Sequence, residues 1–297
     1  MSEKLITVFT PTYNRAHTLV RTYESLCRQT CDDFEWLIID DGSTDNTEEV
    51  VKGWLQEKKI PIRYIKKENG GLHTGYNEAL KNIDTELCVC IDSDDYMPDN
   101  AIEIINRIWS DKGAGNFAGI IGLDYIAKSN TPVGGRFSKI EKPVHFLDIR
   151  YKMNHHGDTK MVLRTDLIKP FVPMPSFPGE KNFNPIYFYF KINPKIPYIL
   201  VNENLCFVDY QNDGMSVNIY NQFVNSPRSF AELRKLAISH PKIPFSRKLI
   251  ESMYLSSSAA IAKDYKVLKG HYNKLFLFFG IPFGIIFALY CKIKATK

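Results

Sequence analysis

The chain has 297 residues, of which 44% are hydrophobic and 24% are charged, and its formal net charge is +5. This composition excludes wholesale disorder and is typical of one large globular domain, or of one domain with an appendage. The positive charge is mild, and no lysine- and arginine-rich run is dense enough to predict binding to nucleic acid. The six cysteines lack zinc-ligand spacing, and the first residues do not resemble a secretory leader. We therefore expect a reducing, cytosolic compartment.

The first hundred residues alternate between strand and helix patterns. Short apolar runs rich in β-branched residues predict strands at 5–10, 34–39, 62–65 and 87–91. Helical spacing and helix-start signals predict helices at 16–28, at 45–55, from residue 75 and at 98–109. Apolar strands that alternate with helices are typical of an α/β fold with a mostly parallel central sheet flanked by helices.

The pattern is looser after residue 113. Residues 120–127 and 160–164 are predicted strands, and residues 196–210 are predicted to be extended. The proline-rich stretch 174–185 is irregular and suits a substrate loop. The aromatic run Tyr187–Phe190 is interpreted as core, with a sugar-stacking surface as the alternative. Residues 223–262 are predicted to be helical, with a break near Pro241 and Pro244.

Polar loops follow the first four predicted strands, and ligands of parallel sheets bind beyond the carboxyl ends of the strands. In the last of these loops, Asp92, Asp94 and Asp95 directly follow the apolar run 87–91. Like charges this close repel one another unless a cation, a partner or water compensates. Because carboxylate oxygens are the ligands that Mg²⁺ and Mn²⁺ prefer, Asp92 and Asp94 are predicted metal ligands. A solvated turn is the alternative interpretation.

Two further loops at the same edge carry groups that suit a nucleotide. The Asp41 carboxylate could accept hydrogen bonds from a base N–H or a ribose hydroxyl, whereas Ser43 and Asp45 are better explained by a turn and a helix cap. In the loop that begins at Asn69, backbone amides or His73 could approach a phosphate, and a plain turn is an equal alternative for the two glycines there.

Glu180 is a lone acid in the irregular stretch. By itself it is interpreted as a surface residue; to act as a general base it would have to lie near the acceptor hydroxyl with a suitable pKa.

Four motifs in order, VFTPTYNR, LIIDDGSTDNT, ENGGLHTGYNEAL and CIDSDDYMPDNAI, closely resemble those of the family 2 glycosyltransferases. Members of this family have the GT-A fold and transfer sugars from nucleotide diphosphates with inversion. The resemblance continues more weakly through GDTKMVLRTDLI, FPGEK and YQNDGMS. Relatives often carry a second acid shortly after the GEK triplet, where this chain has NFNP.

The resemblance implies a role for each matching residue. Pro11 and Tyr13 would line the nucleotide pocket, and Asp41 would hold the base, commonly uracil. Asp92 would lie near the ribose or the metal, and Asp94 would ligate a divalent cation, Mn²⁺ or Mg²⁺, that also binds the diphosphate. Glu180 falls where such enzymes place the acid that deprotonates the acceptor hydroxyl.

The C-terminal stretch from Leu275 to Cys291 contains no charged residue and lies between Lys274 and Lys292. A membrane-spanning helix needs roughly 20 apolar residues, and Gly280, Pro282 and Gly284 interrupt this shorter run. The stretch and its flanking lysines therefore predict an in-plane or shallow membrane anchor near anionic lipid. A buried helix of the core or of an oligomer interface is the alternative.

These inferences divide the chain into a GT-A catalytic domain at 1–218, a helical region at 219–270 and an apolar, basic, membrane-associating tail at 271–297. Within the first, residues 1–112 would bind the nucleotide sugar and residues 113–218 the acceptor. We expect inverting transfer from a nucleotide-diphosphate sugar, with UDP favoured, to a hydroxyl of a glycan or lipid-linked acceptor. The expected setting is bacterial surface-polysaccharide synthesis on the cytoplasmic side of the cell membrane.

Two other functions stay open at this point. A sugar nucleotidyltransferase would also use paired acids on a parallel sheet, although the chain lacks the lysine-bearing, glycine-rich loop near its N-terminus that such an enzyme needs. A non-catalytic relative that binds nucleotide sugars is the second alternative.

Overall fold

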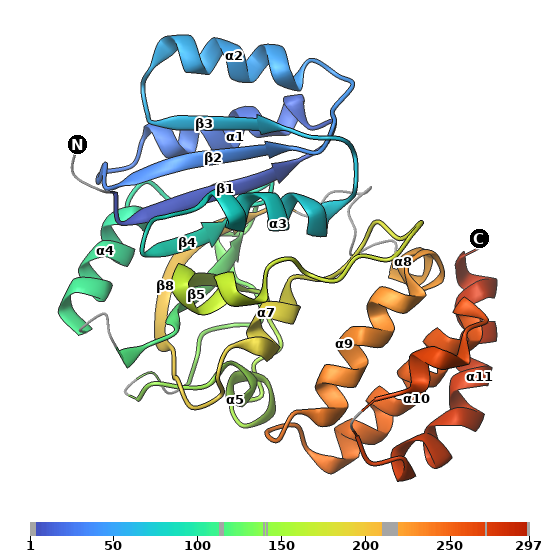
Figure 1. The fold of residues 1–297 in the computed structure, drawn as a ribbon. Coiled ribbons are helices and arrows are strands. Elements are labelled where there is room, and N and C mark those ends of the chain that lie inside the picture. Colours follow the sequence, from blue (N-terminus) through green and yellow to red (C-terminus); the bar gives the residue numbers. More distant parts are fainter. Residues whose placement is uncertain are drawn as a thin grey trace. The chain divides into compact units, whose positions relative to one another are not determined.

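The computed structural model describes residues 4–112, 116–138, 140, 142–209, 219–270 and 272–295, and Figure 1 shows its ribbon. The YQNDGMS motif at 210–216 and the last lysine of the predicted tail, Lys297, lie outside the described residues. The strands, helices and contacts of the fold are those of these residues.

A single eight-stranded sheet forms the centre of the fold, in the order β3-β2-β1-β4-β7-β5-β6 with β8 beside β5. The strands β1 to β4 pair in parallel, β7 is antiparallel to β4 and β5, and β8 is parallel to β5. The sheet is therefore mixed, with an all-parallel N-terminal half. Its strands are β1 Ile6–Thr12, β2 Phe34–Asp40, β3 Ile62–Lys66, β4 Leu87–Cys90, β5 Gly119–Ile126, β6 Thr131–Pro132, β7 Thr159–Arg164 and β8 Ile199–Val208.

The predicted strands are confirmed, and only the two-residue β6 had no signal in the sequence because it is too short to show alternation. Four α-helices belong to the N-terminal half: α1 Ala16–Cys27, α2 Thr47–Glu57, α3 Leu72–Asn82 and α4 Ala101–Lys112. The later helical segments are α5 Phe146–Tyr151, α6 Thr165–Ile168, η2 Lys169–Phe171, α7 Ile186–Lys191, α8 Ile219–Asn225, α9 Pro227–Ser239, α10 Phe245–Ala262, η3 Tyr265–Leu268 and α11 Leu275–Ala295.

Aromatic packing fixes α1 and α2 to the sheet. The Tyr23 ring of α1 stacks on the Trp54 ring of α2 with centroids 4.3 Å apart, and both lie against Trp36 of β2. All three belong to the main hydrophobic core. Because α1 buries Leu19, Tyr23 and Leu26 at helical spacing, its opposite side can carry polar groups without cost to the core.

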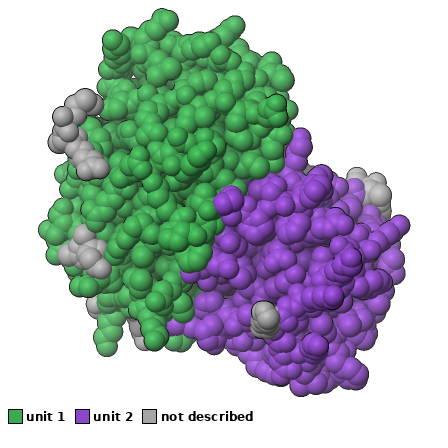
Figure 2. All heavy atoms as spheres, in the orientation of Figure 1, with its two compact units in different colours: residues 1–70, 74–172, 192–210 green, residues 71–73, 173–191, 211–297 purple. Residues whose placement is uncertain are grey.

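The described chain falls into two compact units, coloured separately in Figure 2. Unit 1 comprises residues 1–70, 74–172 and 192–210, and unit 2 comprises residues 71–73, 173–191 and 211–297. Unit 1 contains the whole sheet, and unit 2 contains α7 to α11. The two units are defined by which residues contact one another in space. The boundaries predicted at residues 112, 218 and 270 are instead drawn from the function expected of each segment, and they stay a prediction.

Unit 2 is helical, as the sequence predicts. Its helices α9 and α10 are interrupted between Ser239 and Phe245, which confirms the predicted break near Pro241 and Pro244. In α7, Phe188 is buried, which agrees with the interpretation of the aromatic run as core, while its neighbours are half-buried.

The helix α11 is 21 residues long and, by length and composition, apolar enough to cross a membrane, with a mean hydropathy of 2.0 over its most apolar stretch. One side is made of small residues that approach α10. A Cβ added to Gly280 would lie 2.6 Å from Ser252 Oγ, and one added to Gly284 would lie 2.6 Å from the Met253 carbonyl oxygen. Glycine is thus required at both positions for α11 to pack this closely on α10.

Candidate functional site

The carboxyl ends of the first strands meet at one edge of unit 1, as predicted. Thr12 of β1 pairs with Asp40 of β2, and Asp40 pairs with Lys66 of β3. The residues that directly follow these strands therefore lie at the same edge of the sheet; they are Tyr13, Asp41 and Lys67. The D-x-D motif follows β4, which pairs with β1 on its other side.

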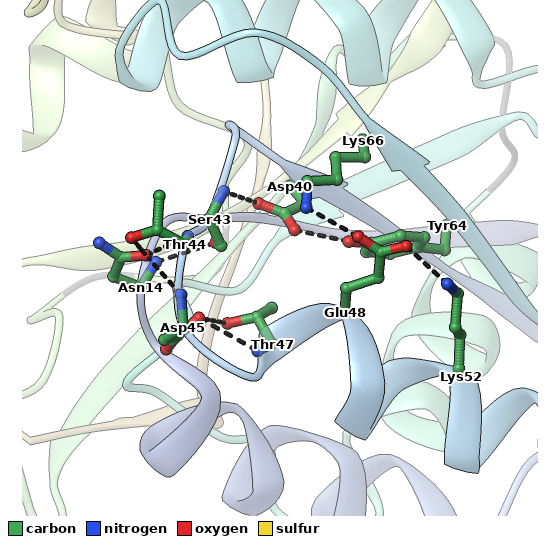
Figure 3. A network of polar contacts seen from close by, with 10 residues as sticks. All are labelled: Asn14, Asp40, Ser43, Thr44, Asp45, Thr47, Glu48, Lys52, Tyr64 and Lys66. Atoms are coloured by element: carbon green, nitrogen blue, oxygen red, sulfur yellow. Dashed lines mark hydrogen bonds and ion pairs between the residues drawn. The ribbon is translucent and has the colours of Figure 1, made fainter.

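The first acid of the DDGS motif, Asp40, has a structural role, as Figure 3 shows. It is fully buried, and its carboxylate accepts hydrogen bonds from the Tyr64 hydroxyl at 2.5 Å and the Ser43 amide at 2.7 Å. Burial and this hydrogen bond raise the pKa of Tyr64, so the hydroxyl stays a donor. Asp40 thereby fixes the loop that carries Asp41.

Hydrogen bonds between loops hold the rest of the motif (Figure 3). The Asn14 side chain accepts from the Thr44 amide at 2.8 Å, and the Asp45 carboxylate accepts from the Thr47 amide at 3.1 Å at the start of α2. The Ser43 hydroxyl accepts from the Asn14 amide at 2.9 Å. The interpretation of Ser43 and Asp45 as turn and cap residues agrees with these contacts.

A second set of contacts surrounds Asp41, which is buried. Its carboxylate pairs with Lys67 Nζ at 2.5 Å and accepts from the Gly70 amide at 2.9 Å and from Asn69 Nδ2 at 3.1 Å. Asn69 Nδ2 also donates to the Asp41 carbonyl oxygen at 2.9 Å. The structure thus brings together two residues that the sequence predicted separately, and it adds Lys67, whose only sequence signal is its place directly after β3.

The other two residues predicted for the nucleotide pocket lie on or just after β1. Pro11 is buried, and a Cβ added to Gly75 of α3 would lie 3.1 Å from Pro11 Cβ. Tyr13 is exposed, with 47% of its surface accessible. An exposed aromatic ring at this edge is available to a ligand, and its role in nucleotide binding stays a prediction.

The D-x-D loop forms a tight turn after β4, with the Asp95 amide donating to the Asp92 carbonyl oxygen at 3.0 Å. Asp92 is exposed, Asp94 is half-buried and Asp95 is buried. Burial, together with the negative charge of Asp92, raises the pKa of Asp94. A divalent cation would relieve this repulsion, so the donor chemistry of Asp92 and Asp94 fits Mg²⁺ or Mn²⁺. Within the described ranges, no three His, Cys, Asp or Glu side chains come together as a metal cage.

A buried charge pair lies behind the D-x-D loop. Lys160 Nζ of β7 is 3.6 Å from Asp124 Oδ1 of β5, and both side chains are almost fully buried. Burial raises the pKa of Asp124 to about 6 although Lys160 opposes the shift. Burial alone would lower the pKa of Lys160, but the charges of Asp124 and of other nearby acids outweigh it and raise that pKa. Burial also raises the pKa of Asp95.

His73 and Glu180 belong to unit 2. His73 is buried, and its Nε2 lies 3.3 Å from Ser176 Oγ. Gly71 has φ +93°, and an added Cβ would lie 1.9 Å from the Lys181 carbonyl oxygen, so only glycine fits there. The segment 71–73 thus packs on the irregular stretch that carries Glu180.

Glu180 is buried and caps a helix. Its Oε1 accepts from the Arg228 amide at 2.9 Å, and its Oε2 accepts from the Ser229 amide at 2.8 Å. These are the second and third residues of α9, whose N-cap residue, Ser226, makes no capping hydrogen bond with its side chain. A distant acid therefore supplies the cap that a local side chain would usually supply.

Comparison with known proteins places the chain in a family. The model described as Glycosyl transferase family 2 matches residues 7–169. The chain belongs to this family. GlyG, a glycosyltransferase of Streptococcus pneumoniae, is 34% identical over 115 residues, which are 38% of each chain. Chondroitin synthase of Pasteurella multocida is 36% identical over 100 residues, 34% of this chain and 10% of that protein. The chain thus spans well under half of either relative.

Solved structures agree in fold. Staphylococcus aureus TarS 1–349 in complex with UDP-GlcNAc has a TM-score of 0.61 at 19% identity, covering 86% of this chain and 72% of that one. The mannosyltransferase PcManGT of Pyrobaculum calidifontis, in complex with GDP-Man and Mn²⁺, has a TM-score of 0.57 at 16% identity, covering 98% and 87%. The predicted GT-A fold is confirmed, and the chain belongs to a family of glycosyltransferases.

The buried Asp124 predicts a pH dependence of stability. Between its ordinary pKa of 3.8 and its folded value of about 6, only the folded state keeps the proton, so stability falls as the pH rises through this window. The loss is complete above pH 6 and amounts to roughly 3 kcal/mol. Urea unfolding of the metal-free protein at several pH values measures it.

In Asp124→Asn, this part of the pH slope is expected to disappear. Asp166→Asn, at an exposed acid, serves as the control and should keep the wild-type slope. Equal slopes in the wild type and in Asp124→Asn would show that Asp124 titrates normally in the fold.

Proposed function

We propose that the chain transfers a sugar, with inversion at the anomeric carbon, from a UDP-sugar to a hydroxyl of a glycan or lipid-linked acceptor. The observation that carries the proposal is the edge of unit 1, where Asp41 follows β2 and the D-x-D acids follow β4, the parallel strands on either side of β1, in a family 2 glycosyltransferase. Bacterial surface-polysaccharide synthesis is the proposed setting, supported by the likeness to a chondroitin synthase.

The groups around Asp41 support uracil as the base. Uracil presents one ring N–H donor between two carbonyl acceptors. The Asp41 carboxylate is the acceptor proposed for that ring N–H, with Asn69, whose two amide protons bond to Asp41, holding it in place. Cytosine lacks the ring N–H and does not match. The comparison structures are described with UDP-GlcNAc and with GDP-Man, so guanine is the base against which the proposal is tested.

Asp92 and Asp94 are the proposed protein ligands of a divalent cation, Mn²⁺ or Mg²⁺. Such a cation is typically held by one or two carboxylates, with substrate phosphates and water as its other ligands. When bound, it would stabilise the negative charge of the leaving nucleoside diphosphate. Two observations support this assignment: the negative charge of Asp92 raises the pKa of Asp94, and the structure of PcManGT is a complex with GDP-Man and Mn²⁺.

Calorimetric titration of UDP, GDP and dTDP, each with and without Mn²⁺, tests donor and metal together. We expect UDP to bind most tightly and only weakly without Mn²⁺. Asp94→Ala should weaken Mn²⁺-dependent UDP binding at least tenfold, about 1.4 kcal/mol. Asp99→Asn, at an exposed acid of the same loop, is the matched control. Wild-type affinity in Asp94→Ala would contradict the metal assignment, and tighter binding of GDP would contradict the base.

Glu180 is the proposed general base that removes the proton from the acceptor hydroxyl. A carboxylate that accepts one amide hydrogen bond at each oxygen keeps further lone pairs for such a proton. Its capping role complicates the usual test, since Glu180→Gln places an NH₂ donor against an amide donor of α9. This variant is expected to lose both activity, by about 10²–10⁴-fold, and stability.

A second substitution separates the two roles. Ser226→Asp supplies a local cap for the Arg228 and Ser229 amides, and in the Glu180→Gln background it should restore the thermal midpoint but not transfer. Transfer rates and thermal unfolding are measured on both variants. Recovery of transfer together with stability would show that Glu180 only caps α9 and that the base lies elsewhere.

The tail helix α11 is the proposed membrane contact, on the cytoplasmic side. Its small residues Gly280, Gly284, Ala288 and Cys291 are buried, while bulky apolar side chains are exposed. Lys274 precedes the helix, and Lys292 lies in its last turn beside Lys294. Because one side packs on α10, lipid cannot surround the helix, which supports an in-plane position rather than a spanning one.

Sedimentation with vesicles that contain anionic lipid tests the membrane contact. We expect the wild type to bind and the double variant Phe283→Glu, Ile286→Glu to lose binding, since both side chains are more than 60% exposed. Leu55→Glu with Ile140→Glu introduces the same charge at exposed apolar residues of unit 1 and should leave binding unchanged. Vesicle binding by the α11 double variant would contradict the proposal. A wild type that forms oligomers and does not sediment with vesicles would also contradict it.

A further inference from the structure

Two neighbouring side chains of α1, Arg21 and Thr22, reach the D-x-D loop. Arg21 Nη2 donates to the Asp94 carbonyl oxygen at 2.6 Å, and Nη1 pairs with Asp209 Oδ2 at 2.8 Å. The guanidinium also lies over the Tyr96 ring, 5.5 Å from its centroid. One planar cation thus contacts three residues that flank or form the acidic turn, all within unit 1.

The next residue of α1 continues this contact. Thr22 Oγ1 donates to the Asp95 carbonyl oxygen at 2.7 Å, within the protein interior. Successive α1 side chains therefore hold successive carbonyls of the acidic turn. Since α1 is itself fixed by Leu19 and Tyr23 in the core, these bonds tie the turn to a rigid support.

The other side of the turn is tied to β8. Tyr96 and Phe207 exchange backbone hydrogen bonds at 3.1 and 2.7 Å, and their rings stack with centroids 5.1 Å apart. The Asp209 amide, two residues further along, points to Asp95 Oδ1 at 3.4 Å. The Asp209 carboxylate that pairs with Arg21 therefore comes from a segment already attached to the same turn.

We propose that Arg21, oriented by Asp209, is a positioning residue that fixes the Asp94 carboxylate for the divalent cation of the donor complex. The inference rests on the proposed metal role of Asp94. Asp94 needs such support because it follows Asp92 by two residues and is pushed by that like charge. A cation on the carbonyl side of Asp94 offsets part of the repulsion and leaves the carboxylate oxygens for metal.

Arginine suits this role better than lysine. The contact requires two donors in one plane, aimed at a carbonyl and a carboxylate, while the flat face rests on an aromatic ring. A lysine ammonium offers one nitrogen and cannot do all three. Stability alone gives little reason for the arrangement, because the side chains of the ion pair are 39% and 23% exposed, and such pairs contribute little to folding.

A matched control exists in the same unit. Arg63 pairs with Glu35 at 2.9 Å, donates to the Asn82 carbonyl oxygen at 2.7 Å, and the side chains of this pair are 40% and 19% exposed. Arg63 thus repeats the ion pair, the carbonyl contact and the exposure of Arg21, but it lies on β3 and holds a carbonyl at the end of α3. Replacing Arg63 should therefore lower the stability about as much as replacing Arg21, without changing the Mn²⁺ concentration needed for UDP binding.

The test measures the Mn²⁺ concentration that gives half-maximal UDP binding in the full chain, alongside the thermal midpoint without metal. Arg21→Met is expected to raise that concentration at least tenfold, while its thermal midpoint falls no further than that of Arg63→Met. Arg21→Lys should also raise the half-maximal Mn²⁺ concentration. If Arg21→Met does not fold, Arg21→Lys replaces it in the test. In a double-mutant cycle, Asp209→Asn should add little in the Arg21→Met background.

The outcomes separate the two proposals. A wild type that binds UDP without regard to Mn²⁺ overturns the metal assignment and this inference with it. A Mn²⁺-dependent wild type whose Arg21→Met and Arg21→Lys variants keep the same half-maximal concentration overturns the role of Arg21 alone. Fully additive effects of Arg21→Met and Asp209→Asn would show that Asp209 does not act through Arg21.

Discussion

Negative charge at the edge of the parallel half-sheet is the constraint on which the rest of unit 1 depends. Acids follow β2 and β4, and each one that is not available for a ligand is matched by a specific partner. Asp40, at the end of β2, accepts from Tyr64, and Asp95, after β4, accepts from the Asp209 amide. Further along the sheet, Asp124 of β5 is paired with Lys160. Without such partners, buried carboxylates would be protonated or would unfold their surroundings. In the D-x-D turn Asp92 is exposed and Asp94 is half-buried, two residues apart, which makes this turn the natural place for a cation.

The same constraint explains why the loops around the site are joined so thoroughly to one another. Asp41 is bonded to Lys67, Asn69 and Gly70 of the loop after β3, and Asn14 after β1 holds the loop after β2. A pocket built from several strand ends has no covalent frame of its own. Its geometry is set by side chains that bridge the loops, so polar residues there are needed for shape as well as for ligand contact.

In unit 2, the N-terminus of one helix and one side of another are satisfied by residues from elsewhere in the unit. The N-terminus of α9 is satisfied by Glu180, which links an irregular stretch to a regular helix without a local capping residue. In α11, glycines at positions four apart allow close contact with α10, while the opposite side keeps its bulky apolar residues exposed. One helix therefore serves both as a packing element and as the proposed contact with lipid.

The sequence by itself determined the alternation of strands and helices, the polar loops at one sheet edge and the family, because each depends on local spacing. Apolar runs such as 87–91 become strands wherever the chain folds as α/β, and their carboxyl ends must then gather. The break between α9 and α10 was also visible, since Pro241 and Pro244 exclude a continuous helix. The short β6 and the reversal of β7 left no such local pattern.

Only the tertiary structure decided which polar residues act together. Arg21 lies in the middle of a helix and Asp209 lies 188 positions away along the chain, so no spacing could join them to Asp94. The same holds for Lys160 with Asp124, and for Glu180 with the amides of α9. Long-range side-chain contacts depend on how elements pack, which periodicity does not encode, whereas each element's own conformation follows from neighbouring residues.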